Sequence, residues 1–344
     1  MGHEDELLPG WSGVKCSFPS TTFGARLREG KGCYLEPLPK PCYVILHIGA
    51  GPTHFEEANG PALIVKDCGR FFLSNDIWIE RLDESLAKKV QKACEPQHYN
   101  IGTQEHDRHL YAFVQRVPDV ESRPYEGLET LHAVLALSRL IHPTSVGDRY
   151  CGKIFHYGLP ESSIYAVQYR GMSPDIFLGS KQRDWLSLGH GETLRGLMPW
   201  VSRKKRMHHR VHRAYWYHEY VMRSSMLDIR LPLVATGLES LINTSEHGSG
   251  TQFHVRVAQL AAASGIAFSE AEAKKAWKLR SKLAHAEAFL YGLDTVLPAN
   301  EHNDLYEKLE AILRSTVLRC LLDESFGDWF RDTDAVEAHW PLKP

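Results

Sequence analysis

The sequence predicts an α+β protein, in which a mixed α/β domain over residues 1–190 precedes an all-α antiparallel helical bundle over residues 191–344. Three observations predict this division. Residues 1–70 are rich in Gly and Pro and are broken by short apolar runs. From about Glu192 onward, apolar residues recur at helical spacing almost without interruption. With 344 residues, 43% of them hydrophobic, the chain is long enough for two domains with real cores.

In the N-terminal domain, two kinds of apolar spacing predict strands and helices. Short runs rich in β-branched and aromatic residues predict strands at 43–48, 62–65, 70–73, 110–117 and 164–170. The stretch 75–94 changes to helical spacing, and a second helix is expected around 128–141, before Pro143. The apolar face of the first would consist of Leu82, Leu86, Val90 and Ala93.

Local signals place the helices of the C-terminal bundle. Leu227 to Leu241 has helical spacing, and Pro232 predicts that this helix starts near it, where a missing N–H costs nothing. Polar residues 243–250 end it. A helix over Phe253 to Ala261 follows and stops at Gly265.

Two further helices complete the predicted bundle. Ser269 and Glu272 have the spacing of a capping box, in which each side chain satisfies the other residue's backbone N–H. The helix that they open includes Arg280. Pro298 and Asn300 introduce the last long helix, which extends to Leu321.

Composition limits where the protein acts. The formal net charge is −2, so attraction to nucleic acid or membranes must be local. The seven cysteines form no CxxC pair, which is typical of reduced thiols in a cytoplasmic protein. The acidic start, Met1 to Glu6, has no apolar run and predicts no signal peptide. No run of about 18 apolar residues occurs, so no membrane span is expected.

The segment Arg280-Ser281-Lys282-Leu283-Ala284-His285 could form a compact reaction centre. Histidine can transfer a proton near neutral pH, and an arginine can hold a phosphate and stabilise its developing charge. On a regular helix, five residues turn through about 500°, so Arg280 and His285 would point about 140° apart. A two-fold dimer removes this difficulty by offering both pairs to one cleft. The alternative is a surface arginine and a helix-end histidine.

The order of three segments resembles the HEPN superfamily, and within it the ApeA-like HEPN proteins of prokaryotes. A helix with an LE-x-L core contains Glu239, an R-x-A-x-L helix begins at Arg256, and an RS-x-x-x-H motif begins at Arg280. The match covers roughly residues 205–325. Ala286 stands where family members often have glycine, which affects the local turn more than the chemistry.

The resemblance implies a helical, metal-independent endoribonuclease that works as a homodimer and leaves 2′,3′-cyclic phosphate ends. His285 would be the general acid or base, and Arg280 would hold the scissile phosphate. Ser281 would bind the phosphate or orient the imidazole. Glu239 would support the site, or would be an exposed acid. The family further implies a toxin-like role in antiviral defence against phage by RNA cleavage, with a phage-derived trigger acting on the N-terminal domain.

A second feature is a basic segment over residues 203–213, which has six fixed positive charges and no acid. If the segment is helical, Arg203, Arg206, Arg210 and Arg213 form one stripe that suits a phosphate backbone. Lys204 and Lys205 add to it. The tyrosines and tryptophan at 215–220 could stack on bases. The alternatives are a solvated helix face and core aromatics.

No metal or cofactor is expected. The closest histidine pairs, His106 with His109 and His208 with His209, lack a matching cysteine or carboxylate framework. No phosphate-binding glycine loop and no GxSxG motif occur. Two other readings remain: a non-catalytic HEPN module that binds RNA or a protein partner, and a structural dimerisation domain.

Overall fold

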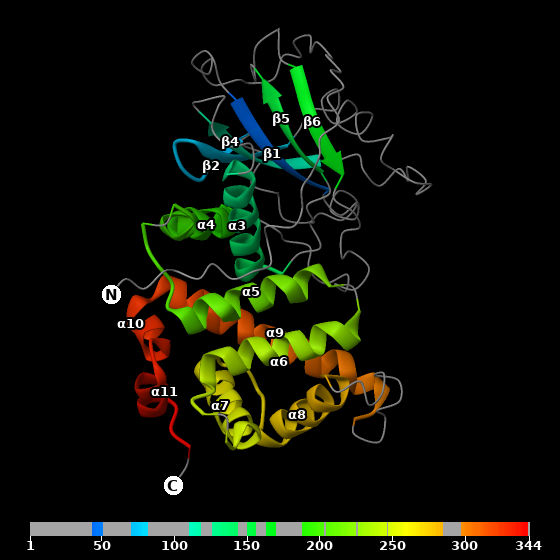
Figure 1. Ribbon diagram of the computed structural model, residues 1–344, viewed down its shortest axis with the longest axis vertical. Coiled ribbons are helices and arrows are strands. Elements are labelled where there is room, and N and C mark those ends of the chain that lie inside the picture. Colours follow the sequence, from blue (N-terminus) through cyan, green and yellow to red (C-terminus); the bar gives the residue numbers. More distant parts are fainter. Residues whose placement is uncertain are drawn as a thin grey trace, which may run out of the picture.

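The computed structural model describes residues 43–50, 70–81, 110–117, 126–143, 150–155, 163–169, 188–202, 204–224, 226–245, 247–284 and 297–342. Within these ranges all strands lie in the N-terminal half, and the chain from residue 188 onward is helical. Figure 1 shows the sheet at one end of the molecule and the C-terminal helices at the other. The predicted α+β class and helical C-terminal part are therefore confirmed.

Six antiparallel strands form one sheet in the order β2-β3-β4-β1-β5-β6. Their bounds are β1 Tyr43–Ala50, β2 Arg70–Phe72, β3 Ile77–Arg81, β4 Leu110–Val117, β5 Tyr150–Phe155 and β6 Ser163–Tyr169. The central strand β1 pairs with β4 from Tyr43↔Val117 to Ala50↔Leu110. Its other edge pairs with β5, which the sequence pattern did not predict.

Strand β3 corrects the predicted helix over 75–94. Ile77 to Arg81 pairs with β4 on one side and with β2 on the other. The turn before it is closed by Ser74, whose Oγ accepts hydrogen bonds from the backbone N–H groups of Asp76 and Ile77. The sequence Ile-Trp-Ile suits a strand, and pairing on both edges outweighs the helical spacing that begins at Leu82. Residues 82–94 and the predicted strand 62–65 lie outside the described residues.

Most side chains on both faces of the β2–β3 hairpin are buried, and Phe72 is exposed. Phe71, Ile77 and Ile79 face the main core. On the opposite face, the fully buried Trp78 donates from Nε1 to Glu80 Oε2 at 3.0 Å. Arg70, which lies directly across from Glu80, donates from Nε to the same oxygen at 2.6 Å. The buried carboxylate therefore has charged and neutral donors, as a buried acid requires.

Helix α3 (Glu126–Ile141) joins the sheet to the helical part. It contacts β1 and β4 on one side and α4, α5 and α9 on the other. Figure 1 shows it standing between the sheet and α5. The predicted division at residue 190 falls inside α4 (Leu188–Val201), which contacts both α3 and α9. The core is accordingly continuous from Phe113 of β4 to Leu313 of α9.

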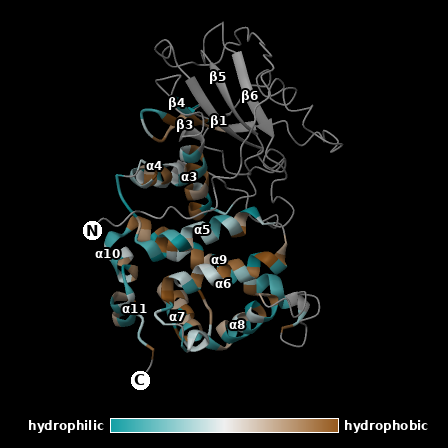
Figure 2. Cartoon of the chain, viewed as in Figure 1, coloured by the Kyte–Doolittle hydropathy of each residue, from teal (hydrophilic) through white to brown (hydrophobic). Residues whose placement is uncertain are grey.

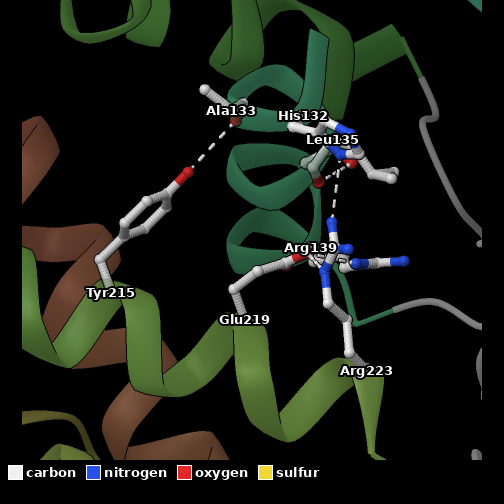
Figure 3. Close-up of polar contacts among 8 residues, drawn as sticks. His132, Ala133, Leu135, Arg139, Tyr215, Glu219 and Arg223 are labelled. Atoms are coloured by element: carbon white, nitrogen blue, oxygen red, sulfur yellow. Dashed lines mark hydrogen bonds and ion pairs between the residues drawn. The ribbon is translucent and has the colours of Figure 1, made fainter. Parts of the chain in front are cut away.

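A buried polar network fastens α3 to α5 (His209–Arg223). Arg139 Nη1 lies 2.7 Å from Glu219 Oε1, and both side chains are almost fully buried. Arg223 donates from Nε to the same oxygen at 2.7 Å, and its Nη2 lies 3.2 Å from His132 Nδ1. Nearby, Tyr215 Oη donates to the carbonyl oxygen of Ala133 at 3.3 Å. Figure 3 shows these α5 side chains pointing toward α3.

The remaining helices form the C-terminal part. Their bounds are α6 Leu227–Ile242, α7 Ser249–Ala263, α8 Glu270–Ala284, α9 Ala299–Leu322, α10 Glu324–Gly327, the 3-10 helix η5 Asp328–Phe330 and α11 Thr333–His339. Helices α5 and α6 pack side by side along a hairpin. Figure 2 shows apolar and polar residues interleaved along them, as expected for helices with one buried face.

Most helix ends follow the predicted signals. Ser269 and Glu272 form the capping box: Ser269 N–H donates to Glu272 Oε2 at 2.7 Å, and Glu272 N–H donates to Ser269 Oγ at 3.2 Å. Gly265 has a left-handed φ of 68° and ends α7 with Schellman hydrogen bonds from Gly265 and Ile266. The predicted start near Pro232 is wrong, because α6 begins at Leu227 and contains the proline. Core packing by Leu231 and Val234 holds this helix despite one missing backbone hydrogen bond.

Replacement of Arg139 by Met should lower the free energy of unfolding, measured with urea, by about 3 kcal/mol. This value is at the lower end of the range for a broken buried ion pair, because Arg223 still contacts Glu219. Adding Glu219→Leu should recover part of that loss. The control is Arg331→Met, which removes an exposed pair and should leave the unfolding free energy nearly unchanged. Equal effects of the two single replacements would contradict the role assigned to the network.

The capping box should give α8 an acid-sensitive stability. Burial alone would raise the pKa of Glu272, but hydrogen bonds from Lys308 and Ser269 outweigh it and lower the pKa to about 2. Because the folded-state pKa lies below the ordinary value of 4.5, this stabilisation is complete above about pH 4.5 and is lost as the pH falls toward 2. The difference in unfolding free energy between the wild type and Glu272→Gln should therefore shrink over that range. A difference that stays constant down to about pH 2 would contradict this role of the capping box.

Candidate functional site

The structure brings Arg280 of α8 and Glu239 of α6 into direct contact. Arg280 Nη2 lies 2.8 Å from Glu239 Oε2. The side chain of Arg280 is 24% exposed and that of Glu239 is 11% exposed, so the pair lies at the edge of the core. Burial raises the pKa of the Glu239 carboxyl, and the charge and hydrogen bond of Arg280 oppose that rise. The sequence allowed Glu239 to be either a support for the site or an exposed acid, and its burial excludes the exposed acid.

Close helix packing fixes where Glu239 lies. Gly237, two residues earlier on α6, is buried against α5 and α9. A Cβ at this position would lie 2.8 Å from Leu313 Cδ2 and 3.1 Å from Tyr217 Cβ. Because only glycine allows this approach without displacing its neighbours, the α6 backbone beside Glu239 has little freedom to move.

The other two predicted catalytic residues lie next to Arg280 along the chain. Ser281 is half-buried on α8, and its side-chain hydroxyl makes no hydrogen bond within the described part of the chain. Helix α8 is described as far as Ala284. His285 lies outside the described residues, so its placement in one site with Arg280 stays a prediction.

Arg256, which begins the R-x-A-x-L segment, is a structural residue. Its guanidinium is almost fully buried and donates from Nε to the carbonyl oxygen of Trp340 at 2.8 Å. Its Nη1 donates to the carbonyl oxygen of Ile242 at 2.6 Å. This one side chain therefore satisfies the end of α6 and anchors the C-terminal residues. The spacing of the segment predicted a helix but gave no indication of these acceptors.

The basic segment is helical only in its second half, which corrects the predicted four-arginine stripe. Helix α5 begins at His209, and residues 204–208 are non-helical. Arg206 therefore precedes the helix, and Arg203 lies outside the described residues. From His209 onward, α5 packs against α3 and α9, whereas the residues before it contact the C-terminal segment. Packing, and not the helical propensity of the basic segment, therefore decides where the helix begins.

The basic segment contacts an acidic C-terminal segment, residues 323–337. Lys205 pairs with Glu324, and His208 Nε2 lies 2.9 Å from Asp328 Oδ1. Arg210 donates to the carbonyl oxygen of Asn243 at 2.6 Å and to Thr333 Oγ1 at 3.1 Å. Figure 1 shows α10 beside the beginning of α5. Two of the six predicted cations, Lys205 and Arg210, are thus already used within the chain.

Three cations of the segment remain available to a ligand. Lys204, Arg206 and Arg213 are exposed and have no ion-pair partner among the residues that the structure describes. Three buried aromatic residues, Phe326, Phe330 and Trp340, anchor the acidic segment nearby. A nucleic acid would therefore meet a smaller positive surface than the sequence predicts.

The aromatic residues after the basic segment divide between core and surface. Tyr215 is buried against α3, as described above. Trp216 donates from Nε1 to His212 Nε2 at 2.9 Å, which requires a neutral acceptor nitrogen. Burial, and then the charge of His209, lower the pKa of His212, in agreement with that role. Tyr220 is exposed, so it could meet a base.

Within the described ranges, no group of three or more His, Cys, Asp or Glu side chains could hold a metal ion. His208 is engaged with Asp328, and His106 and His109 lie outside those ranges. Cys320 is buried with a free thiol. Among the helices described, none is long and apolar enough to cross a membrane.

Comparison of the chain with protein-family models, with curated proteins and with solved structures finds no match. The assignment of a function therefore depends on the residues and their geometry.

Neutralising the acids that face the basic segment should strengthen binding of a polyanion. The double replacement Glu324→Gln/Asp328→Asn frees Lys205 and His208 and should raise affinity for a labelled RNA, measured by fluorescence anisotropy, with a steeper salt dependence. Stability should fall by less than about 1 kcal/mol because both pairs are exposed. Glu301→Gln/Asp304→Asn on α9 changes the net charge equally and is the control. The same gain in both double variants would mean that only net charge matters.

Proposed function

We propose that this chain is a metal-independent endoribonuclease of the HEPN type that acts as a homodimer. The observation that supports it is the contact between Arg280 of α8 and Glu239 of α6 at the edge of a helical core. These two residues are 41 positions apart, and the HEPN resemblance implies a role in the site for both. A half-buried arginine held by one carboxylate is suited to present its remaining donors to a phosphate.

The chemistry requires only groups that the motif supplies. The ribose 2′-oxygen attacks the adjacent phosphorus, and a base removes the 2′-hydroxyl proton. The bond from phosphorus to the 5′-oxygen breaks, and an acid protonates that leaving oxygen. His285 would serve as base or acid, with the second copy in a dimer offering the other histidine. Arg280 would stabilise the charge on the phosphoryl oxygens, and Ser281 would bind the phosphate or orient the imidazole.

The biological role in this proposal is a toxin-like cytoplasmic effector in anti-phage defence. The N-terminal part would sense a phage-derived trigger and the helical part would cut RNA, either tRNA or mRNA. The packing of α3 against both the sheet and α5 supports this assignment of sensing to the N-terminal part and cleavage to the helical part. A signal at the sheet could reach the helices through that contact.

A second candidate is a non-catalytic RNA-binding HEPN module. The exposed cations Lys204, Arg206 and Arg213 favour it, because phosphate contacts of this kind need no reaction centre. In that case Arg280 and Glu239 form a structural pair. The two candidates differ in whether RNA is cut.

The decisive experiment incubates the purified chain with total tRNA and mRNA in EDTA. We expect cleavage that persists without metal, together with loss of at least about 100-fold in rate for His285→Ala and for Arg280→Ala. The cleaved ends should carry 2′,3′-cyclic phosphate. Lys204→Ala, which changes an exposed cation outside the site, should retain most of the cleavage and lose RNA affinity.

Each other outcome favours a different reading. Salt-dependent RNA binding without cleavage would support the binding module. A chain that neither binds nor cuts RNA would support a structural dimerisation role. Normal cleavage by both His285→Ala and Arg280→Ala would rule out the proposed site.

A further inference from the structure

A second contact holds the guanidinium of Arg280 in addition to Glu239. Trp277 lies three residues earlier on α8, and Arg280 Cζ sits 5.1 Å from the centre of its ring. Residues at this spacing are neighbours on a helix surface. A guanidinium over an indole face is attracted by the negative charge of the π system. Arg280 is therefore held by a carboxylate from α6 and by an aromatic face from its own helix.

Helix α7 in turn holds Trp277 in place. Phe253 packs against the indole with ring centres 5.2 Å apart and planes tilted by 44°. The beginning of α7 also approaches closely, since a Cβ at Gly250 would lie 3.1 Å from Trp277 Nε1. The indole thus has Arg280 as one neighbour and the packed residues of α7 as the others. It has little room to turn away from the guanidinium.

These contacts determine which donors of Arg280 remain for a ligand. Nη2 is used by Glu239. Nε is buried and makes no hydrogen bond within the described part of the chain. The guanidinium is planar, so fixing Nη2 and one ring contact also fixes the direction of Nη1. With the side chain 24% exposed and Nε buried, Nη1 and the second N–H of Nη2 are the donors left for a phosphate.

We propose that Trp277 is a positioning residue, which holds the guanidinium plane of Arg280 so that Nη1 faces the phosphodiester to be cut. The proposal rests on the ribonuclease function proposed above. Trp277 does not itself touch the substrate, because its faces are taken by Arg280 and Phe253. Loss of the ring would leave Arg280 attached to Glu239 but free to rotate about that contact.

Two replacements separate positioning from packing. Trp277→Phe keeps an aromatic face beneath Arg280, whereas Trp277→Leu keeps an apolar side chain without that face. We expect Trp277→Leu to lower kcat for RNA cleavage by roughly 10–100-fold with KM nearly unchanged, as expected for a misdirected group. Trp277→Phe should restore most of kcat. A purely structural role would lower the amount of folded protein in both variants and leave kcat per folded molecule unchanged.

A measurement that needs no cleavage tests the same contact. Phenylglyoxal modifies accessible guanidinium groups, and peptide mass spectrometry gives the rate at each arginine of the full chain. Arg280 should react several-fold faster in Trp277→Leu than in the wild type or Trp277→Phe. The exposed Arg213 is the internal reference and should react equally in all three. A faster labelling rate at both arginines in Trp277→Leu would indicate misfolding of that variant. The Arg280 labelling rate in Trp277→Phe would then be compared with that of the wild type instead.

The outcomes separate this inference from the proposed function. An unchanged Arg280 labelling rate in Trp277→Leu overturns the positioning role, and so does wild-type kcat in that variant. If the wild-type chain cuts no RNA, the proposed function fails and the catalytic part of the inference fails with it. The labelling then decides only whether Trp277 fixes Arg280.

Discussion

The buried contact between Arg139 and Glu219 is the constraint on which the arrangement of the whole chain depends. It joins α3, which packs on the sheet, to α5, which packs on α6 and α9. Two buried charges at this distance stabilise each other only in one geometry, so they select the relative position of sheet and helices more than they add to stability. Arg223 and Tyr215 extend the same contact along α5. The sheet and the helical part consequently share one core.

The parts of the fold that local chemistry decides could be predicted from the sequence. Ser269 with Glu272, Gly265 and Pro298 each act within a few residues, and each marks a helix end in the structure. Prediction failed where distant contacts decide. Strand β3 depends on β4, whose paired residues lie 30 to 38 positions later in the chain. Helix α6 continues through Pro232 because the surrounding core holds it.

The candidate site was predictable only in part, for the same reason. The motif order and spacing named Arg280 and Glu239, and these two residues are in contact. Nothing in the local pattern distinguished Trp277 from an ordinary core aromatic, because its role depends on Gly250 and Phe253 of another helix. Arg210 and Arg256 looked like phosphate-binding or motif residues. Their acceptors include backbone and hydroxyl oxygens far along the chain, which the spacing of residues in the sequence does not reveal.

The acceptors of Arg256 also bear on the order of events during synthesis. Its Nε donates to the carbonyl oxygen of Trp340, 84 residues later, and Arg210 donates to Thr333, 123 residues later. Until those residues leave the ribosome, each guanidinium lacks one acceptor, although Arg256 already has Ile242 and Arg210 already has Asn243. The C-terminal residues therefore complete the hydrogen bonding of two helices, α5 and α7, that are synthesised much earlier.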